Sequence, residues 1–490
     1  MSARALMLQG TGSDVGKSLI AAGLARAFTL RGLKVCPFKP QNMSNNAAVT
    51  ADGGEIGRAQ ALQARAARMA PSVHMNPVLL KPETTTGAQV IVHGKRLASL
   101  RARDYFARRQ EFLPAILDSF SRCCADADLV IVEGAGSPAE INLRDGDLAN
   151  MGFAAAAGMP VILIGDIHRG GVIAAIAGTF QILPEADRER LKAIIVNNFH
   201  GDIDLFAEGI AAIENLTGRP CLGVVPHFPD AARLPAEDAV ALETAAAGGT
   251  GECVIAVPRL KRIANFDDLD PLKIEPGVKL VMVQPGAAIP GDARLVILPG
   301  SKSTIADLAW LRRQGWDIDI AAHVRRGGHV LAFCGGYQML GRAIHDPDGL
   351  EGPPGSAAGL CLLDVETTLA GDKALNLVEA THVPSGLALS GYEIHLGHTA
   401  GPDCARPFAL IGTRPDGAIA AGGRIAGTYL HGCLASDGFR RAILASLGAT
   451  PGNHSHDEAV EAALDSLARH LEARLDLDRI REIAAIPAIG

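Results

Sequence analysis

QGTGSDVGKS, at residues 9–18, lies between the short apolar run Ala5–Leu8 and a helical pattern over Leu19–Phe28. Glycines in such a loop let backbone N–H groups point into one concavity, and the N-terminus of the following helix favours a phosphate. Lys17 supplies a positive charge for the β- and γ-phosphates, and Ser18 supplies a ligand for Mg²⁺. The strand–loop–helix context therefore predicts an ATP site at the start of a parallel sheet.

The loop departs at one position from the strict G-x-x-x-x-G-K-S/T spacing, because Thr11 stands where the first glycine is expected. Gly12 and Gly16 remain, and we expect their backbone to contact the phosphates of ATP. The alternative is a glycine turn that ends in Gly-Lys-Ser without binding phosphate.

Short apolar runs alternate with helical patterns through about the first 230 residues, as expected for buried parallel strands with helical crossovers. A stretch rich in Pro, Ala, Asp and Gly follows, and then a second series of the same kind. The expected strands are Ala5–Leu8, Val35–Phe38, Leu129–Val132, Val161–Ile164 and Ala193–Val196, then Val254–Val257, Leu280–Val283, Leu295–Leu298 and Val330–Phe333. We expect an α/β synthetase domain over 1–230, a linker over 231–251, a second α/β domain over 252–440 and a helical tail over 441–490.

Two charged residues follow expected strands of the first domain and suit the ATP site. Glu133 ends the strand Leu129–Val132, where parallel sheets place their ligands, and is a candidate for Mg²⁺. Lys39 follows Val35–Phe38 and can neutralise a transferring phosphoryl group. The alternatives are a loop carboxylate or helix cap for Glu133 and a solvated surface lysine for Lys39.

In the second domain, the strand Val330–Phe333 leads directly into Cys334-Gly335-Gly336. A cysteine on a strand-to-helix turn lies at a helix N-terminus, where its thiolate is stabilised. The small residues that follow allow backbone N–H groups to approach an oxyanion, as in nucleophile elbows. We therefore expect Cys334 to be a nucleophile, with Gly335 and the strand-end loop at Gly300 as candidate oxyanion donors.

A nucleophilic cysteine needs a base, and three histidines compete for this role. His431 follows a short β-prone run, whereas His395 and His398 lie in Gly391-Tyr-Glu-Ile-His-Leu-Gly-His398. Residue chemistry alone does not choose among them.

Composition excludes several classes of protein. The net charge of −7 and the 4% aromatic content give no surface pattern for nucleic acid. No apolar stretch is long enough to span a membrane. The nine cysteines have irregular spacings without a Cys-x-x-Cys pair, so we expect a reducing, cytoplasmic compartment.

Three stretches carry a resemblance to a known family, namely Pro37–Asn46, Gly54–Gln60 and Met75–Pro82. With the two loops above, they resemble the cobyric acid synthase family of glutamine-dependent amidotransferases, from Gly10 to about Gly432. The resemblance implies a P-loop domain similar to dethiobiotin synthetase, followed by a class I (triad-type) glutamine amidotransferase domain.

For the first domain, the resemblance implies that Lys17, Ser18 and Lys39 contact the phosphates of ATP. It further implies that Glu55 and Glu133, with Ser18, bind Mg²⁺. The remaining implied roles are Asn197 at the adenine, and Asp166 and Arg169 near the acceptor.

For the second domain, the resemblance implies Cys334 as nucleophile and His431 as base. Ordinary triad members carry Glu two residues after the histidine, where this chain has Cys433. The group that orients His431 is therefore open, with Glu393 as one substitute.

The implied reaction uses ATP and glutamine to amidate the b, d, e and g propionates of adenosylcobyrinic acid a,c-diamide, a corrinoid. The alternatives are the sister enzyme that amidates the a and c acetates, a nucleotide switch of the partition-ATPase type with a degenerate glutaminase partner domain, and a cell-wall amidotransferase. The sequence does not decide between a monomer and a homo-oligomer.

Overall fold

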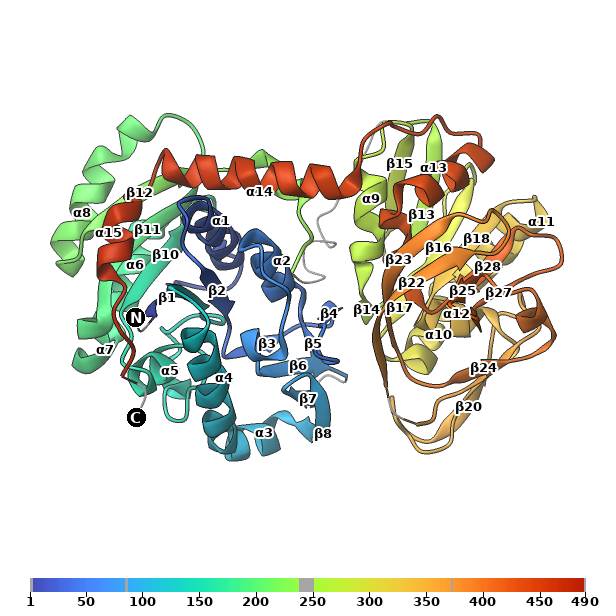
Figure 1. Cartoon of the computed structure of the whole chain (residues 1–490), viewed down its shortest axis with the longest axis horizontal. Coiled ribbons are helices and arrows are strands. Elements are labelled where there is room, and N and C mark those ends of the chain that lie inside the picture. Colours follow the sequence, from blue (N-terminus) through green and yellow to red (C-terminus); the bar gives the residue numbers. More distant parts are fainter. Residues whose placement is uncertain (1–2, 84–86, 238–250, 372, 489–490) are drawn as a thin grey trace.

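The computed structural model describes residues 3–83, 87–237, 251–371 and 373–488. It contains two α/β units side by side, each built around a six-stranded sheet (Figure 1). Among the described residues, no helix combines the length and the apolar character that a membrane-spanning helix requires.

The first unit has a parallel sheet in the order β12-β11-β10-β1-β9-β2. Its central strands are buried on both faces, which explains why they read as apolar runs without alternation. The strands are β1 (Arg4–Gly10), β2 (Val35–Phe38), β9 (Leu129–Glu133), β10 (Val161–Asp166), β11 (Leu191–Phe199) and β12 (Cys221–Pro226). The helices are α1 (Lys17–Leu30), α2 (Arg58–Ala66), α3 (Ala102–Arg108), α4 (Leu113–Ala125), α5 (Met151–Ala156), α6 (Val172–Ile182), α7 (Glu185–Arg190) and α8 (Ala207–Thr217).

The sequence patterns did not predict a smaller sheet, β3-β6-β7-β8, that extends the first unit toward the second. Its strands are β3 (Gln41–Met43), β6 (Val78–Pro82), β7 (Gly87–Val92) and β8 (Lys95–Arg101). A two-stranded ribbon, β4 (Ala47–Val49) and β5 (Glu55–Gly57), lies beside it. Several of these strands are too short to show a period in the sequence.

The second unit has a sheet in the order β15-β13-β16-β18-β28-β27, in which only β27 is antiparallel. Its strands are β13 (Cys253–Pro258), β15 (Val278–Val283), β16 (Leu295–Leu298), β18 (His329–Phe333), β27 (Ala418–Ile419) and β28 (Ile425–Thr428). The helices are α9 (Asp270–Lys273), α10 (Thr304–Arg313), α11 (Trp316–Arg325), α12 (Gly335–Leu340) and α13 (Asp437–Ser446). The nine expected strands are thereby confirmed, with ends that differ by at most three residues.

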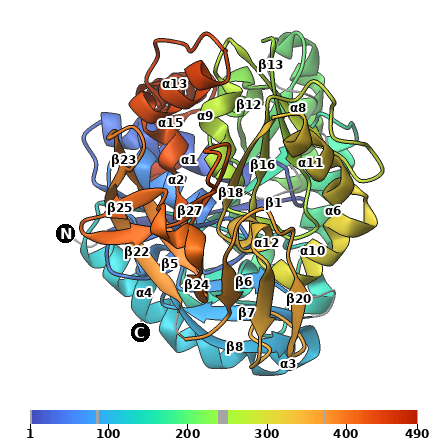
Figure 2. The ribbon, with the colours of Figure 1, turned by 90° about the vertical axis from the view of Figure 1, so that its right-hand side faces the viewer.

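Smaller sheets complete the second unit and include an antiparallel layer, visible in Figure 2. That layer contains β22 (Ala374–His382), β23 (Ala388–His395), β25 (Ala409–Ile411), β26 (Arg414–Asp416) and β29 (Leu430–His431). The others are β14 (Ile263–Ala264) with β17 (Gly300–Ser301), and β19 (Ala343–Asp346), β20 (Gly355–Ala358), β21 (Glu366–Thr368) and β24 (His398–Ala400). One consequence matters for the site: β23 pairs with β29 and brings Tyr392 opposite His431.

The C-terminal segment returns to the first unit. Helix α14 (His456–Glu472) runs across from the second unit and packs on α1, and α15 (Leu477–Ile483) follows it (Figure 1). Ala485 then forms an isolated β-bridge with Ala5 of β1. The predicted helical character of this segment is confirmed, and its apolar face is part of the core of the first unit.

Candidate active sites

The phosphate loop connects β1 to α1, so Lys17 and Ser18 open the helix. Lys17 Nζ donates hydrogen bonds to the carbonyl oxygens of Gly12 (2.8 Å) and Gly136 (3.0 Å). Gly16 has φ +90°, and a Cβ there would lie 2.2 Å from Nδ2 of Asn197. Glycine is therefore required at position 16, both by the backbone conformation and by the close approach of Asn197.

Beside Ser18, three charged groups from separate parts of the chain converge. Lys39 Nζ lies 2.8 Å from Glu133 Oε1 and 2.6 Å from Glu237 Oε1. Ser18 Oγ donates to Glu133 Oε1 at 2.7 Å and also hydrogen-bonds Glu237. Burial opposes the charge on Lys39, but the two carboxylates outweigh it and raise the pKa of Lys39.

The donor set at this point fits Mg²⁺. One hydroxyl and two carboxylates, from Ser18, Glu133 and Glu237, meet within hydrogen-bond distance, and hard oxygen ligands are what Mg²⁺ binds. The other oxygen of Glu133 accepts from Gln63 Nε2 at 2.6 Å, which holds the carboxylate in place.

Sequence reasoning missed Glu237, because it assigned residues 231–251 to a linker. Most of that stretch, 238–250, lies outside the described residues. Glu237 itself is described and accepts hydrogen bonds from Ser18 of the phosphate loop and from Lys39. Its only sequence signal is an acidic residue in a Pro- and Ala-rich segment.

The structure does not bring Glu55, an implied Mg²⁺ ligand, into the lining of the cavity at the phosphate loop. Glu55 is 1% exposed, and its two oxygens pair with Lys81 of the first unit (2.8 Å) and Lys373 of the second (2.6 Å). These lysines hold the pKa of Glu55 at about 2, despite burial that would raise it. Glu55 therefore belongs to the contact between the two units.

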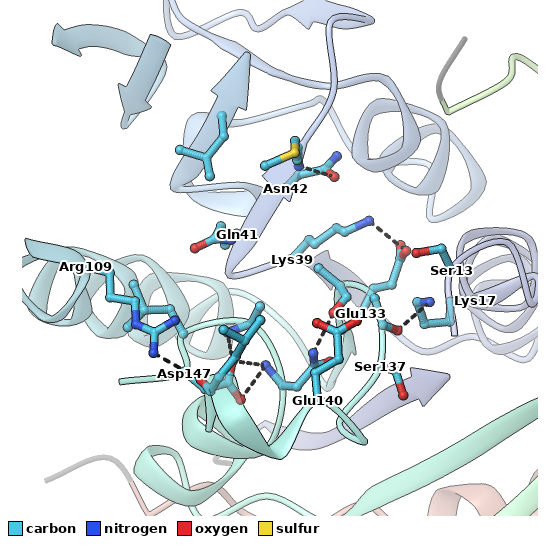
Figure 3. Close-up of a pocket in the computed structure, with 18 of the residues that line it drawn as sticks. Ser13, Lys17, Lys39, Gln41, Asn42, Arg109, Glu133, Ser137, Glu140 and Asp147 are labelled. Atoms are coloured by element: carbon cyan, nitrogen blue, oxygen red, sulfur yellow. Dashed lines mark hydrogen bonds and ion pairs between the residues drawn. The ribbon is translucent and has the colours of Figure 1, made fainter. Parts of the chain in front are cut away.

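A cavity of about 820 Å³ opens in front of the phosphate loop (Figure 3). Figure 3 shows Lys17, Lys39 and Glu133 on one side and Arg109 on the other. The guanidinium of Arg109 lies 4.9 Å from the ring centroid of Phe106, which also lines the cavity. The cavity therefore has a polar side, next to the phosphate loop, and an opposite side that includes the aromatic ring of Phe106.

Three further residues named from the resemblance lie outside this cavity's lining. Asn197, at the end of β11, donates from Nδ2 to the carbonyl oxygen of Val15 at 2.9 Å. Asp166 accepts the backbone N–H of His168 at 2.8 Å, and Arg169 is exposed. The structure places Asn197 against the phosphate loop but does not bring Asp166 and Arg169 to the cavity.

In the second unit, Cys334 lies on a tight turn between β18 and α12. Its φ of +49° and ψ of −111° are unusual for a residue other than glycine. The turn is held by a hydrogen bond from Cys334 N to the carbonyl oxygen of Thr428 (2.9 Å). Such a turn presents the sulfur at the carboxyl edge of the sheet and leaves the first N–H groups of α12 free to point toward it.

His431 faces Cys334 and is oriented by a carboxylate. Its Nδ1 lies 2.7 Å from Asp268 Oδ2, and the other Asp268 oxygen accepts the backbone N–H of Gly432 at 2.6 Å. Burial lowers the pKa of His431, but Asp268 and the hydrogen bond to Cys334 outweigh burial and raise it to about 10. A cationic imidazole beside sulfur stabilises the thiolate.

The orienting group is therefore Asp268, and the substitute suggested above, Glu393, is wrong. Glu393 pairs with Arg414 at 2.7 Å instead. Asp268 is 163 residues from His431 along the chain, in the short 3-10 helix η7 (Phe266–Leu269). No local spacing in the sequence could have found it.

The other candidate histidines have different surroundings. His395 stacks on Tyr429 with ring centroids 3.8 Å apart, and burial lowers the pKa of His395 to about 3. His398 is exposed on β24. Of the three, His431 alone has the paired carboxylate.

The candidate oxyanion glycines lie beside these groups. A Cβ at Gly300 would lie 3.2 Å from Cε1 of His431, and one at Gly335 would lie 3.0 Å from the backbone nitrogen of Ser301. Gly300, Cys334 and His431 line a small cavity of about 40 Å³.

Strands β6 and β7 stand between the two cavities. Leu80 and Val90 line the large cavity, whereas Lys81 and Gln89 line the small cavity of Cys334. Successive side chains of a strand point to opposite faces, so one sheet forms a wall of both sites. The two reaction centres are neighbours in space.

Comparisons with known proteins agree with this architecture. Residues 6–241 match the CobQ/CobB/MinD/ParA nucleotide binding domain, and residues 254–439 match the CobB/CobQ-like glutamine amidotransferase domain. These matches confirm the predicted fold class.

Proteins named cobyric acid synthase are similar over nearly the whole chain. The protein from Rhodobacter capsulatus is 61% identical, covering 98% of this chain and 99% of the relative. The protein from Bradyrhizobium diazoefficiens is 59% identical, covering 98% and 100%. The protein from Methylorubrum populi is 60% identical, covering 97% and 98%. The chain belongs to the cobyric acid synthase family.

Proposed function

We propose that this chain catalyses the reaction of its family, the ATP-dependent amidation of the b, d, e and g propionates of adenosylcobyrinic acid a,c-diamide with ammonia from glutamine. It is a glutamine-hydrolysing carbon–nitrogen ligase of cobalamin biosynthesis. One observation carries the proposal: a Cys–His–Asp arrangement and a phosphate loop with its own large cavity lie on opposite sides of one sheet.

In the glutaminase half, Cys334 sulfur attacks the side-chain amide carbon of glutamine. His431 delivers a proton to the departing nitrogen, so that ammonia leaves and a glutamyl thioester remains. Water then attacks the thioester and releases glutamate and the thiol. Asp268 keeps the imidazole oriented, and the N–H groups of Gly300 and Gly335 are the proposed oxyanion donors.

In the synthetase half, Lys17, Ser18 and the N–H groups at Gly12 and Gly16 bind the phosphates of ATP, and Asn197, which hydrogen-bonds Val15 of the loop, is the proposed contact of the adenine. Ser18, Glu133 and Glu237 are the residues that would hold Mg²⁺, which would neutralise phosphate charge there. Lys39 faces the transferring γ-phosphoryl group.

A carboxylate is a poor electrophile, so it must first carry a leaving group. A propionate oxygen of the acceptor attacks the γ-phosphorus of ATP, which gives an acyl phosphate and ADP. Ammonia attacks the acyl carbon, and the products are the amide and phosphate. Ammonia is released in the cavity of Cys334, and the sheet of β6 and β7 lies between that cavity and the large one.

The large cavity suits a flat macrocyclic acceptor. Its volume of about 820 Å³ and its apolar lining, with Leu100, Tyr105 and Phe106, can bury the face of a corrin ring beside the phosphate loop. Arg109, opposite Lys17, can pair with one of the propionates that is not reacting.

We further propose that residues 1–230 act as the synthetase and 252–440 as the glutaminase, and that α14 and α15 of the segment 441–490 complete the core of the first. A cytoplasmic location is supported by nine cysteines without a disulfide.

The test replaces Cys334 by alanine in the full chain. We expect glutamine-dependent amidation of cobyrinic acid a,c-diamide to be lost, whereas amidation with added ammonia, ATP and Mg²⁺ stays within about twofold of the wild type. Mass gains on the corrinoid and glutamate release are the measurements. Equal loss of both activities would contradict the two-site scheme, and no mass gain with the wild type would contradict the acceptor.

A further inference from the structure

Arg58, the first residue of α2, reaches from the synthetase unit into the second unit. Its Nη2 lies 2.6 Å from the carbonyl oxygen of Ala47, 2.7 Å from Tyr392 Oη and 2.9 Å from Asp267 Oδ2. Tyr392 and Asp267 belong to the glutaminase unit. Arg58 takes part in neither of the two reactions, although its side chain is only 14% exposed.

The two glutaminase partners of Arg58 lie next to the catalytic pair, Tyr392 beside His431 and Asp267 beside Asp268. Asp267 precedes Asp268, the carboxylate that holds His431, in the single turn of η7. The ring of Tyr392 stacks on the imidazole of His431, with centroids 5.2 Å apart and an angle of 13° between the planes. The guanidinium of Arg58 therefore holds both Tyr392, which stacks on the imidazole of His431, and Asp267, which precedes the carboxylate paired with it.

The charges around η7 explain why a cation is needed. Asp267, Asp268 and Asp270 lie within four residues and are largely buried, and Lys273 pairs with Asp270 at 2.6 Å. Arg58 is the cation paired with Asp267. Burial raises the pKa of Asp267 to about 6 even with Arg58 opposing it. Without Arg58, repulsion among these carboxylates would displace Asp267, and Asp268 would move with it.

Helix α2 also contacts the nucleotide site through its next turn. Gln63 Nε2 donates to Glu133 Oε2 at 2.6 Å, and Gln60 accepts from Asn42 at 3.0 Å. Arg58 therefore belongs to a helix that is held at the synthetase site. Its contacts with Tyr392 and Asp267 exist only while the two units are packed together.

We propose that Arg58 is a positioning residue of the glutaminase reaction, supplied by the synthetase unit, which holds the Asp268–His431 pair through Asp267 and Tyr392. The inference rests on the proposed function. It predicts that hydrolysis of glutamine depends on a residue outside the glutaminase unit.

The test compares Arg58→Gln and Arg58→Lys with the wild type in the full chain. The matched control is Arg65→Gln, at the other end of α2, where Arg65 pairs with Glu461 of α14 at 2.8 Å. Three rates are measured: glutamine-dependent amidation, ammonia-dependent amidation, and labelling of Cys334 by 6-diazo-5-oxo-norleucine, followed by mass spectrometry.

For Arg58→Gln, we expect glutamine-dependent amidation and Cys334 labelling to fall about tenfold or more, because a small displacement of a catalytic group is costly. Ammonia-dependent amidation should stay within about twofold. Arg58→Lys should recover part of the labelling rate, since it restores the charge without the planar fork, and Arg65→Gln should match the wild type.

Wild-type labelling in Arg58→Gln would overturn the inference, and so would an equal fall of ammonia-dependent amidation, which would indicate a role in the fold. Labelling needs only the glutaminase centre. It therefore tests Arg58 even if the wild type fails to amidate cobyrinic acid a,c-diamide, an outcome that would count against the proposed function alone.

Discussion

At the scale of single residues, Asp268 has the largest effect on the chemistry of His431. It accepts two hydrogen bonds, one from Nδ1 of the imidazole and one from the backbone N–H of Gly432, and uses a separate carboxylate oxygen for each. An asparagine would place an NH2 donor where one of these two oxygens stands, so in this geometry it cannot accept from both donors. The carboxylate therefore sets both the orientation and the charge of the base.

Replacing Asp268 by asparagine should slow glutaminase turnover by about tenfold or more, because the imidazole loses its orientation. The pH profile should change as well. In the wild type, burial lowers the pKa of His431, but Asp268 outweighs this effect and the pKa is about 10. Without the carboxylate the pKa of His431 falls, so the alkaline limb of kcat/KM for glutamate release moves to lower pH.

Asp292→Asn provides a control for this experiment, since it removes an exposed carboxylate that does not line the cavity of Cys334 and His431. Ammonia-dependent amidation serves as the second control and should be unchanged in both variants. An alkaline limb at the wild-type pH in Asp268→Asn would show that another group holds the charge of His431.

At the scale of elements, the contact between α1 and α14 explains why the C-terminal segment is needed. A Cβ at Gly23 of α1 would lie 2.5 Å from Leu471 Cδ1 and 2.9 Å from Leu467 Cγ. The two helices therefore approach closely at a glycine, and the apolar face of α14 is buried in the core of the synthetase unit.

Leu464→Ala should lower the free energy of unfolding of the synthetase unit by about 2–5 kcal/mol, because Leu464 is 0% exposed and its loss leaves a cavity. The measurement is urea unfolding followed by circular dichroism. Arg469→Ala, on the exposed face of the same helix, should have little effect. Equal stability of the two variants would show that α14 is only loosely attached.

At the scale of the whole molecule, the two units are joined by buried charge as well as by apolar packing. Ala47 and Leu79 of the first unit form one apolar cluster with Tyr392 and Ile394 of the second. Near it, the Glu55 carboxylate pairs with a lysine from each unit. Burial lowers the pKa of Lys373 to about 7, with Glu55 opposing that effect.

Glu55→Gln should destabilise the docked arrangement by about 3–5 kcal/mol, because it leaves two buried lysines without a counter-charge. We therefore expect glutamine-dependent amidation to fall more than ammonia-dependent amidation. The Mg²⁺ concentration for half-maximal ammonia-dependent activity should not change, whereas it should rise in Glu133→Gln. A raised Mg²⁺ requirement in Glu55→Gln would restore the metal role that the structure argues against.

Features encoded in short stretches of chain could be read from the sequence. The phosphate loop, the turn at Cys334 and nine buried strands depend on local spacing and on continuous apolar runs, which one segment shows without its neighbours. Lys39 and Glu133 could be named because Lys39 follows a strand and Glu133 ends one, and the carboxyl ends of parallel strands meet at one edge. The family resemblance supplied the choice of His431 and the corrinoid acceptor.

Only the tertiary structure decided which polar and charged groups, far apart in the sequence, pair with one another. Asp268 and Glu237 lie in segments without a helical or strand period, and each reaches its partner over more than a hundred residues. Arg58 and Glu55 stand in a stretch that marks the family, yet only the packing of two units directs their side chains to the glutaminase side. The pairing of buried charges depends on the distance between them in space, and this distance cannot be predicted from the local sequence around each residue.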